Sequence, residues 1–357
     1  MSGGGPRPLD GPWFEDLSVG AVDDQAPSLT LTSGMAAAHQ AVTGDRLRLP
    51  LDHHLCREVT GQPAPLAHPA LVWDVATGQS TLVTRMVVAN LFYRGLSFDR
   101  APAIGDTLTT TTEVVALRQN RPRPGRRATG LAALRITTVD QERRPVLGFW
   151  RCAMLPLRDP LGRTGRDDDL DRVGAADGTA DGGRPPERAT SGWRLDRFRD
   201  AVPGTHFDGV EAGGSWAVDG GDVVSSAPEL ARLTLNVARI HHDGTGGDGT
   251  GGDGTAGDGT AGGGGRLVYG GHTIALALAQ ATRAIPNLLT VVAWQRCDHL
   301  GPVREGDTLS SVVSVERAEP LPRGGGLAHL RSRVRALAGR GDEARDVLDW
   351  RFVAAMA

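Results

Sequence analysis

An internal duplication constrains the fold of this chain more than any other feature of its sequence. The first copy begins with Phe-Glu-Asp-Leu-x-Val-Gly at residues 14–20, and the second begins with Phe-Asp-Gly-Val-Glu-Ala-Gly at residues 207–213. Each copy later reaches the tetrapeptide Gly-Asp-Thr-Leu, at 105–108 and at 306–309. A repeat of this period is too long for a solenoid and predicts two copies of one small domain, for which 357 residues are sufficient.

The two copies are expected to form two domains joined by a linker. Residues 7–158 hold the first domain and residues 201–357 the second. Between them, residues 159–200 are rich in Asp, Gly and Arg and contain a Pro-Pro pair, so we expect a flexible linker. Within the second domain, residues 243–265 repeat the pentapeptide Asp-Gly-Thr-Gly/Ala-Gly. Calcium-binding β-helices use a period of nine with recurring apolar residues, so this repeat predicts a disordered surface insertion instead.

Each domain shows the same order of expected elements. Helices are expected over 34–43 and 68–77 in the first copy, and over 225–235 and 273–284 in the second. Four strands follow in each copy, at 81–98, 106–119, 128–140 and 146–157 and then at 289–297, 308–316, 326–337 and 347–355. The second helix of each copy is apolar or Ala-rich, and small side chains let a sheet approach closely. The pattern predicts an α+β double hot dog, in which two antiparallel sheets each wrap around a central helix.

Composition excludes several classes of function. The net charge is −3, so nothing favours a nucleic-acid partner or an anionic membrane surface. No apolar run approaches the length of a membrane span, and the N-terminus lacks the apolar core of a signal peptide, so we expect a cytoplasmic protein. The cysteines Cys56, Cys152 and Cys297 are widely separated, which indicates neither a zinc site nor a disulfide framework.

The candidate catalytic residues lie where the first helix of the second copy ends. His241 follows Asn236 by five residues. A His and a short polar side chain at a helix end can hold one water molecule between them, and a His with a pKa near neutrality can take its proton. Asn cannot take a proton, so His241 is the main acid/base candidate. Taken alone, the run His241-His242-Asp243 favours the alternative, a polar exit from a helix into a disordered loop.

The tripeptide Gly-Gly-His at 270–272 immediately precedes the Ala-rich helix of the second copy. Two glycines at a buried helix start would let a thioester oxygen approach the N–H groups of Gly270 and Gly271, where the helix dipole also favours negative charge. His272 would orient the substrate or complete the site. The alternative is an ordinary N-terminal turn. Addition of water to a double bond conjugated with a thioester needs both a held water and a stabilised oxygen, so the two motifs together favour hydration.

The first copy lacks this combination. Asp45 remains, but Pro50 stands where the partner His would fall. The shifted register of His53 and His54 predicts surface positions, and His68 precedes the first central helix without glycines beside it. The first domain is therefore expected to have lost its dyad and to hold the rest of the substrate.

These motifs resemble those of the mesaconyl-CoA hydratases (β-methylmalyl-CoA dehydratases), double hot-dog members of the MaoC-like hydratase superfamily. The matching stretches are 14–20, 89–95, 105–111 and 117–120 in the first half, and Arg232, Asn236, 238–241, 268–272 and 306–308 in the second. MaoC-like hydratases typically carry Asp five residues before the His, and the Asn at this position is shared with the mesaconyl-CoA hydratases. The resemblance implies reversible hydration of mesaconyl-CoA, a CoA thioester, to β-methylmalyl-CoA without a metal or other cofactor.

A substrate with a free carboxylate should require a cation in its pocket, because burying an unpaired charge is costly. Arg239 and Arg232 are the nearest in sequence to the expected site, and each is a candidate for the substrate carboxylate or for CoA. The alternative for both is an ordinary surface position.

Two other functions remain open. Hot-dog proteins also include acyl-CoA thioesterases, which usually carry an acidic residue on or near the central helix, whereas helix 273–284 has none. A non-catalytic acyl-CoA-binding protein is the third reading, although the set of Asn236, His241 and Gly-Gly-His counts against it. The sequence leaves a homo-oligomer open.

Overall fold

The computed structural model describes residues 10–174, 186–243, 266–337 and 343–357. Nearly all of the predicted insertion at 243–265 lies outside the described residues, as does part of the predicted linker.

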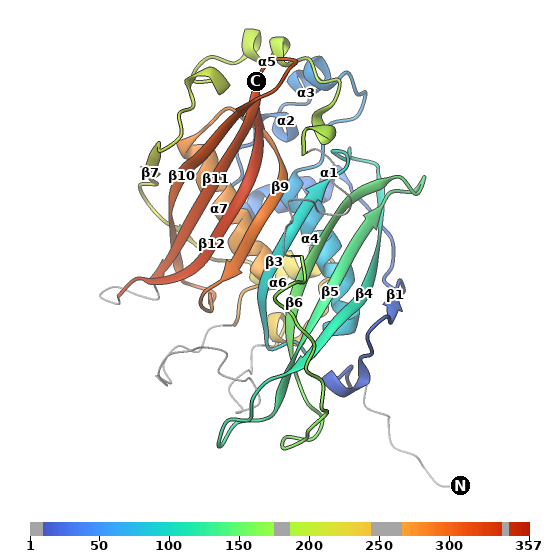
Figure 1. The fold of residues 1–357 in the computed structure, drawn as a ribbon. Helices are drawn as coiled ribbons and strands as arrows, with labels where there is room; N and C mark the ends of the chain where they lie inside the picture. The colour runs from blue at the N-terminus through green and yellow to red at the C-terminus, as the bar shows by residue number, and fades with distance from the viewer. Residues whose placement is uncertain (1–9, 175–185, 244–265, 338–342) are drawn as a thin grey trace.

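Both copies contain the expected helices and strands in the expected order (Figure 1). The first copy contains helices α1 (Ser33–Thr43), α2 (Arg48–Leu51), α3 (His53–Thr60) and α4 (Pro69–Gln79), and strands β1 (Val22–Asp23), β2 (Leu29–Thr30), β3 (Ala89–Phe98), β4 (Thr107–Gln119), β5 (Thr129–Val139) and β6 (Pro145–Pro156). The second contains helices α6 (Ala227–Leu233) and α7 (Gly270–Ala284), and strands β7 (Ser215–Ala217), β8 (Asp222–Val223), β9 (Leu288–His299), β10 (Thr308–Pro320), β11 (Gly326–Leu337) and β12 (Arg345–Met356). Helix α5 (Leu195–Ala201) lies between the copies.

The strands form one continuous antiparallel sheet instead of two separate ones. Its order is β1-β4-β5-β6-β3-β9-β12-β11-β10-β7, with β2 added beside β4 and β8 beside β10. The copies join where β3 pairs with β9, for example at Tyr93 with Cys297. These two strands would otherwise be exposed edges, and their pairing satisfies the backbone groups of both.

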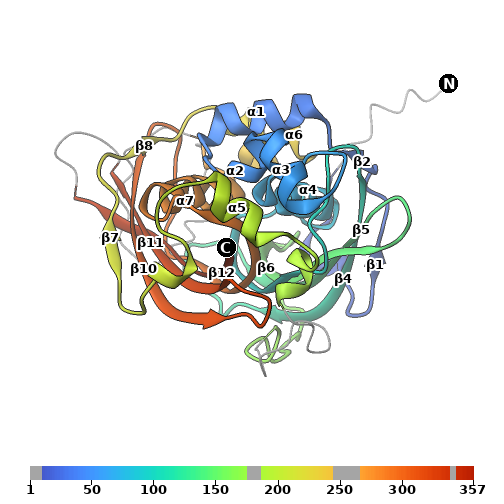
Figure 2. The ribbon, with the colours of Figure 1, turned by 90° about the horizontal axis from the view of Figure 1, so that it is seen from above.

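The two central helices lie inside the curve of this sheet (Figure 2). Every residue of α4 is buried, as are residues 271–282 of α7. The side-chain amide of Gln79 donates to Leu108 O at 3.0 Å, and the amide of Gln280 donates to Leu309 O at 2.9 Å. Each helix is thus fixed to its own half by the same contact, and the structure confirms the double hot-dog fold.

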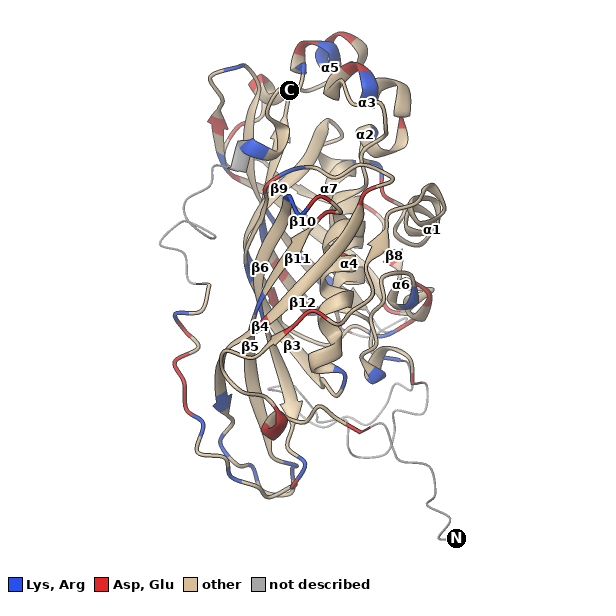
Figure 3. Cartoon of the chain, turned by 90° about the vertical axis from the view of Figure 1, so that its right-hand side faces the viewer, with Lys and Arg blue, Asp and Glu red and all other residues tan. Residues whose placement is uncertain are grey.

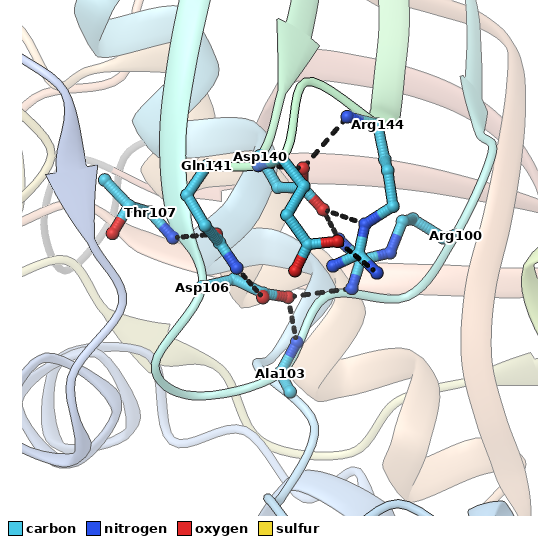
Figure 4. A network of polar contacts seen from close by, with 8 residues as sticks. Arg100, Ala103, Asp106, Thr107, Asp140, Gln141 and Arg144 are labelled. Atoms are coloured by element: carbon cyan, nitrogen blue, oxygen red, sulfur yellow. Dashed lines mark hydrogen bonds and ion pairs between the residues drawn. The ribbon is translucent and has the colours of Figure 1, made fainter.

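The duplicated Gly-Asp-Thr tripeptide has a structural role. Asp106 accepts hydrogen bonds from Ala103 N at 2.9 Å and Arg100 Nη2 at 3.0 Å, and Arg100 also pairs with Asp140 (Figure 4). In the second copy Asp307 accepts from Arg304 N at 2.8 Å. The preceding glycines have φ values of +106° and +90°, which favour glycine. The motif therefore forms the same kind of turn in both copies.

Two segments differ from the sequence-based expectations. The strand expected from residue 81 begins only at Ala89, because Ser80–Thr84 forms a 3₁₀ helix in which the Thr81 hydroxyl donates to Gly78 O at 2.6 Å. The described parts of the expected linker pack against the domains. Leu170 is buried with neighbours on the sheet, and Phe198 of α5 is fully buried.

Most Arg, Asp and Glu residues lie in loops, at strand ends and on outer helices (Figure 3). Charged groups buried beneath the sheet are therefore exceptions to this distribution. Among the described residues, no helix is both long enough and apolar enough to cross a membrane.

Candidate active site

The loop after α6 places Asn236 inside the molecule. Leu235 has a φ of +59°, a left-handed conformation that turns the chain inward at the end of the helix. Asn236 is 2% exposed, and its Oδ1 accepts a hydrogen bond from Ala238 N at 3.0 Å. The amide oxygen is therefore occupied in holding the turn, and the NH₂ group is the part of this side chain that can donate to a ligand.

This loop of the second half rests on the first half. A Cβ atom at Gly78 of α4 would lie 1.7 Å from Thr234 O, so only glycine permits the contact. Val237 N donates to Thr81 Oγ1 at 2.9 Å, and Arg239 N donates to Arg85 O at 3.1 Å. The candidate site therefore lies where the two copies meet.

His241 is held in one protonation pattern by a backbone group. Its Nδ1 lies 3.1 Å from Leu267 O. A carbonyl can only accept, so Nδ1 carries the proton and Nε2 keeps its lone pair. Burial lowers the pKa of His241 to about 4, with the nearby Arg151 acting in the same direction and the Leu267 carbonyl opposing both. His241 is thus neutral at pH 7, with Nε2 in the form that accepts a proton.

The start of α7 explains why two glycines occur there. A Cβ at Gly270 would lie 2.7 Å from His299 Nε2, and one at Gly271 would lie 2.0 Å from Asp74 Oδ1. The N–H groups of both glycines belong to the first helical turn, where the helix itself provides no acceptor. Since Leu267 is the partner of His241 and lies just before this turn, the base and these donors are close in the fold.

His272 lies deeper and faces another neighbour. It is fully buried, and neither ring nitrogen has a hydrogen-bond partner within the described residues. Burial lowers its pKa to about 4. His272 contributes to the lowered pKa of His39 on α1, after burial and His68. The expectation that His272 orients the substrate or completes the site stays a prediction.

The two Arg residues chosen from the sequence lie on the surface. Arg232 is exposed and pairs with Glu229, one helical turn away, at 3.5 Å. Arg239 is exposed, with its Nη1 3.9 Å from Met86 Sδ. Neither is a buried cation, since both residues are exposed. The other role expected for them, a contact with CoA, stays a prediction.

A buried cation does exist, on the other half of the molecule. Arg151 of β6 is 2% exposed and donates from Nη2 to Ser80 O at 3.0 Å and to Thr84 Oγ1 at 2.6 Å. Its Nε has no partner, and no carboxylate pairs with it within the described part of the chain. Burial lowers its pKa, and the hydroxyls of Tyr93 and Tyr269 oppose that effect.

Asp74 of α4 is a second buried group that the sequence analysis missed. It is fully buried, and neither carboxyl oxygen has a hydrogen-bond partner among the described residues. Both residues left a signal in the sequence. Asp74 is the one acidic residue in an apolar helix. Arg151 lies on the same face of its strand as Phe149 and Ala153, because residues two apart share a face.

The corresponding groups of the first half are already paired with one another. His68 Nδ1 accepts from Ala70 N at 3.1 Å, so Nε2 carries the proton, and it lies 2.8 Å from Asp45 Oδ2. This His has no lone pair left, and Pro69 contributes no N–H to the helix start. His53 and His54 are exposed, as expected. Both ring nitrogens of His68 are thus engaged, and the expectation that the first half has lost its dyad stays a prediction.

Comparisons with known proteins agree with this architecture. No family model matches the chain. Rv0216 of Mycobacterium tuberculosis, a solved structure described as a conserved hypothetical protein with a double hot-dog fold, is 53% identical, with 97% of this chain and 99% of that chain covered and a TM-score of 0.86. The β-methylmalyl-CoA dehydratase of Chloroflexus aurantiacus is 27% identical over 338 residues, 92% of this chain and 89% of that protein. The mesaconyl-CoA hydratase of Cereibacter sphaeroides is 27% identical over 337 residues, 90% of this chain and 88% of that protein.

The fold is therefore that of double hot-dog proteins, which it shares with MaoC-like dehydratases. The chain belongs to the double hot-dog family that includes Rv0216. The two curated homologues named above are hydro-lyases that act on CoA thioesters, at low identity to this chain.

Proposed function

We propose that the protein is a hydro-lyase that adds water reversibly to an enoyl-CoA thioester, with mesaconyl-CoA as substrate and β-methylmalyl-CoA as product. The observation that carries this proposal is the state of His241. Its Nδ1–H is fixed on Leu267 O, so its Nε2 is a free base beside the start of α7. The names of the two curated homologues support the same chemistry.

In the proposed reaction a water molecule lies between Asn236 and His241. The Asn236 NH₂ group donates to the water oxygen, and His241 Nε2 takes a proton as that oxygen attacks the β-carbon of the substrate. The thioester oxygen gains negative charge and accepts from the N–H groups of Gly270 and Gly271. The imidazolium then returns its proton to the α-carbon, so that one water is added and His241 ends neutral.

Arg151 supports a substrate with a free carboxylate. A buried cation without a counter-ion is unfavourable in the empty protein, and an anionic ligand group removes that cost. Arg151 lies within electrostatic range of His241 and Tyr269, which supports a role for its charge in the proposed site. In this proposal Arg151 takes the role that the sequence analysis assigned to Arg239 or Arg232.

The test is incubation of the purified protein with a panel of enoyl-CoA esters, with products followed by mass. Mesaconyl-CoA should gain 18 mass units, the mass of one water, and crotonyl-CoA, which has no carboxylate, should react more slowly. A preference for crotonyl-CoA would contradict the dicarboxylate assignment. Absence of hydration with every ester would contradict the hydro-lyase assignment.

Thioester hydrolysis is retained as a second candidate because of Asp74. Helix 273–284 has no acidic residue, but the other central helix supplies one, and it lies against Gly271. Release of free CoA from saturated and unsaturated esters distinguishes hydrolysis from hydration in the same assay. A protein that binds the esters without either reaction would be the non-catalytic alternative.

A further inference from the structure

Asp74 lies at the boundary between the two halves, against the helix start that the proposed function uses. The carboxyl group comes from α4 of the first half, and its Oδ1 occupies the space beside Gly271 of the second half that a Cβ would fill, at 2.0 Å from the ideal Cβ position. The Tyr269 hydroxyl donates to the backbone oxygen of Asp74 at 3.4 Å. Asp74 is therefore held directly beside the proposed thioester-binding turn.

The surroundings of Asp74 do not suit a charged carboxylate. Its two oxygens have no hydrogen-bond partner within the described residues, and no described Arg pairs with it. Burial raises the pKa of Asp74 well above its ordinary range, and the nearby Tyr269 hydroxyl opposes this effect only in part. An uncharged carboxylic acid is a hydrogen-bond donor, and apolar surroundings make it an effective one toward a developing oxyanion.

The position is also asymmetric between the copies. Gln79 and Gln280 make the same contact in the two halves, so the residue five places before each is equivalent, and Asp74 corresponds to Ala275. Only the α4 helix therefore carries a carboxyl group, and it directs that group across the boundary to α7. The first half, which has no free base of its own, would contribute in this way to the site of the second.

We propose that the Asp74 carboxyl group donates a hydrogen bond to the thioester oxygen of the bound substrate, beside the N–H groups of Gly270 and Gly271. This inference rests on the proposed function. Asp74 is then a catalytic residue of the site, because the charge that develops on that oxygen during addition of water strengthens its hydrogen bond.

The experiment compares Asp74→Asn, which keeps a donor of the same shape, with Asp74→Leu and Asp74→Ala, which have none. Loss of one oxyanion donor is expected to lower kcat by about 10²–10³-fold in the Leu and Ala variants, with little change in KM. The Asn variant should remain within about tenfold of wild type, since an amide N–H still donates. Asp45→Asn, which alters another buried carboxyl group of the first half, is the matched control and should leave kcat unchanged.

A second measurement does not depend on turnover. Butyryl-CoA labelled with ¹³C at the carbonyl cannot be hydrated, and its carbonyl stretch, measured by infrared difference spectroscopy, falls as hydrogen bonds to the oxygen strengthen. The stretch of the bound ester should be lowest in wild type and Asp74→Asn, and should rise in Asp74→Leu and Asp74→Ala. Thermal unfolding identifies any variant that fails to fold. The comparison then uses whichever of Asp74→Leu and Asp74→Ala does fold.

Two results would overturn the inference. One is an identical carbonyl stretch in wild type and in the folded variants without a donor. The other is an Asp74→Asn variant as impaired as Asp74→Leu, which would mean that an ionisable group is required, as in base-assisted hydrolysis. If wild type hydrates no ester, the proposed function fails, whereas the infrared comparison still decides the role of Asp74.

Discussion

Replacement of Arg151 by Met provides a sharp test of how this protein recognises its substrate. The Met side chain retains most of the apolar volume and removes the charge. In wild type, Arg151 has an unpartnered Nε and no described counter-ion, so an entering carboxylate would gain ionic hydrogen bonds that the free protein lacks. Two such bonds at about 1.5–3 kcal/mol each sum to about 3–6 kcal/mol. At 1.36 kcal/mol per tenfold, kcat/KM for mesaconyl-CoA should fall by roughly 10²–10⁴-fold.

The same substitution should affect crotonyl-CoA far less. That ester has no carboxylate, and removal of an unpaired buried cation is neutral or favourable for the protein. The substitution does break the bonds to Ser80 O and Thr84 Oγ1, which hold the 3₁₀ helix that contacts the loop at Val237. A purely structural effect would therefore lower kcat/KM for both esters equally.

The assay measures kcat/KM for both esters side by side in Arg151→Met, with thermal unfolding to confirm the fold. Arg239→Met and Arg232→Met are the matched controls, since both residues are exposed and should leave the ratio of the two esters unchanged. Equal losses on the two esters in Arg151→Met, or a changed ratio in Arg239→Met, would refute the assignment of Arg151 to the substrate carboxylate.

Four further predictions follow from the site and its supports. His241→Ala should lower kcat by roughly 10²–10⁴-fold with the fold intact, and near-full turnover would remove His241 from the mechanism. Asp45→Ala should lower the melting temperature, because it leaves His68 unpaired inside the protein, yet kcat should stay close to wild type; a loss of turnover as large as that of Asn236→Ala would contradict a single active site. Gly78→Ala should impair both stability and turnover, since its Cβ would lie 1.7 Å from Thr234 O; unchanged kcat would show that the loop tolerates displacement from α4. Because burial depresses the pKa of His241 and His272 to about 4, the unfolded chain binds protons that the folded chain does not, so the free energy of unfolding should fall as pH drops from about 6.5 towards 4. Urea denaturation at pH 5 and pH 7 measures this, and equal stability at the two values would count against neutral buried imidazoles.

The sequence alone determined the duplication, the order of the elements and the double hot-dog fold. The duplication is visible when the two halves of the sequence are compared. The elements follow from local patterns, since apolar periodicity, glycine turns and an Ala-rich helix can each be recognised within a short segment. The spacing of Asn236 and His241 and the glycines at 270–271 were also legible, because each motif lies on one continuous segment. Short helices such as α2 and α3, and the 3₁₀ helix at Ser80–Thr84, were missed because one or two turns carry too few residues to show a clear period.

Only the tertiary structure decided which side chains meet across the boundary of the two copies. Asp74 and Gly271 are far apart in sequence, and their contact depends on how α4 crosses α7 within one sheet. Arg239 is close to His241 in sequence but is exposed, whereas Arg151 is buried on a strand of the other half, within electrostatic range of His241. Sequence proximity pointed to Arg239 and Arg232, which are exposed, because no local pattern connects residues of one copy with a buried cation contributed by the other.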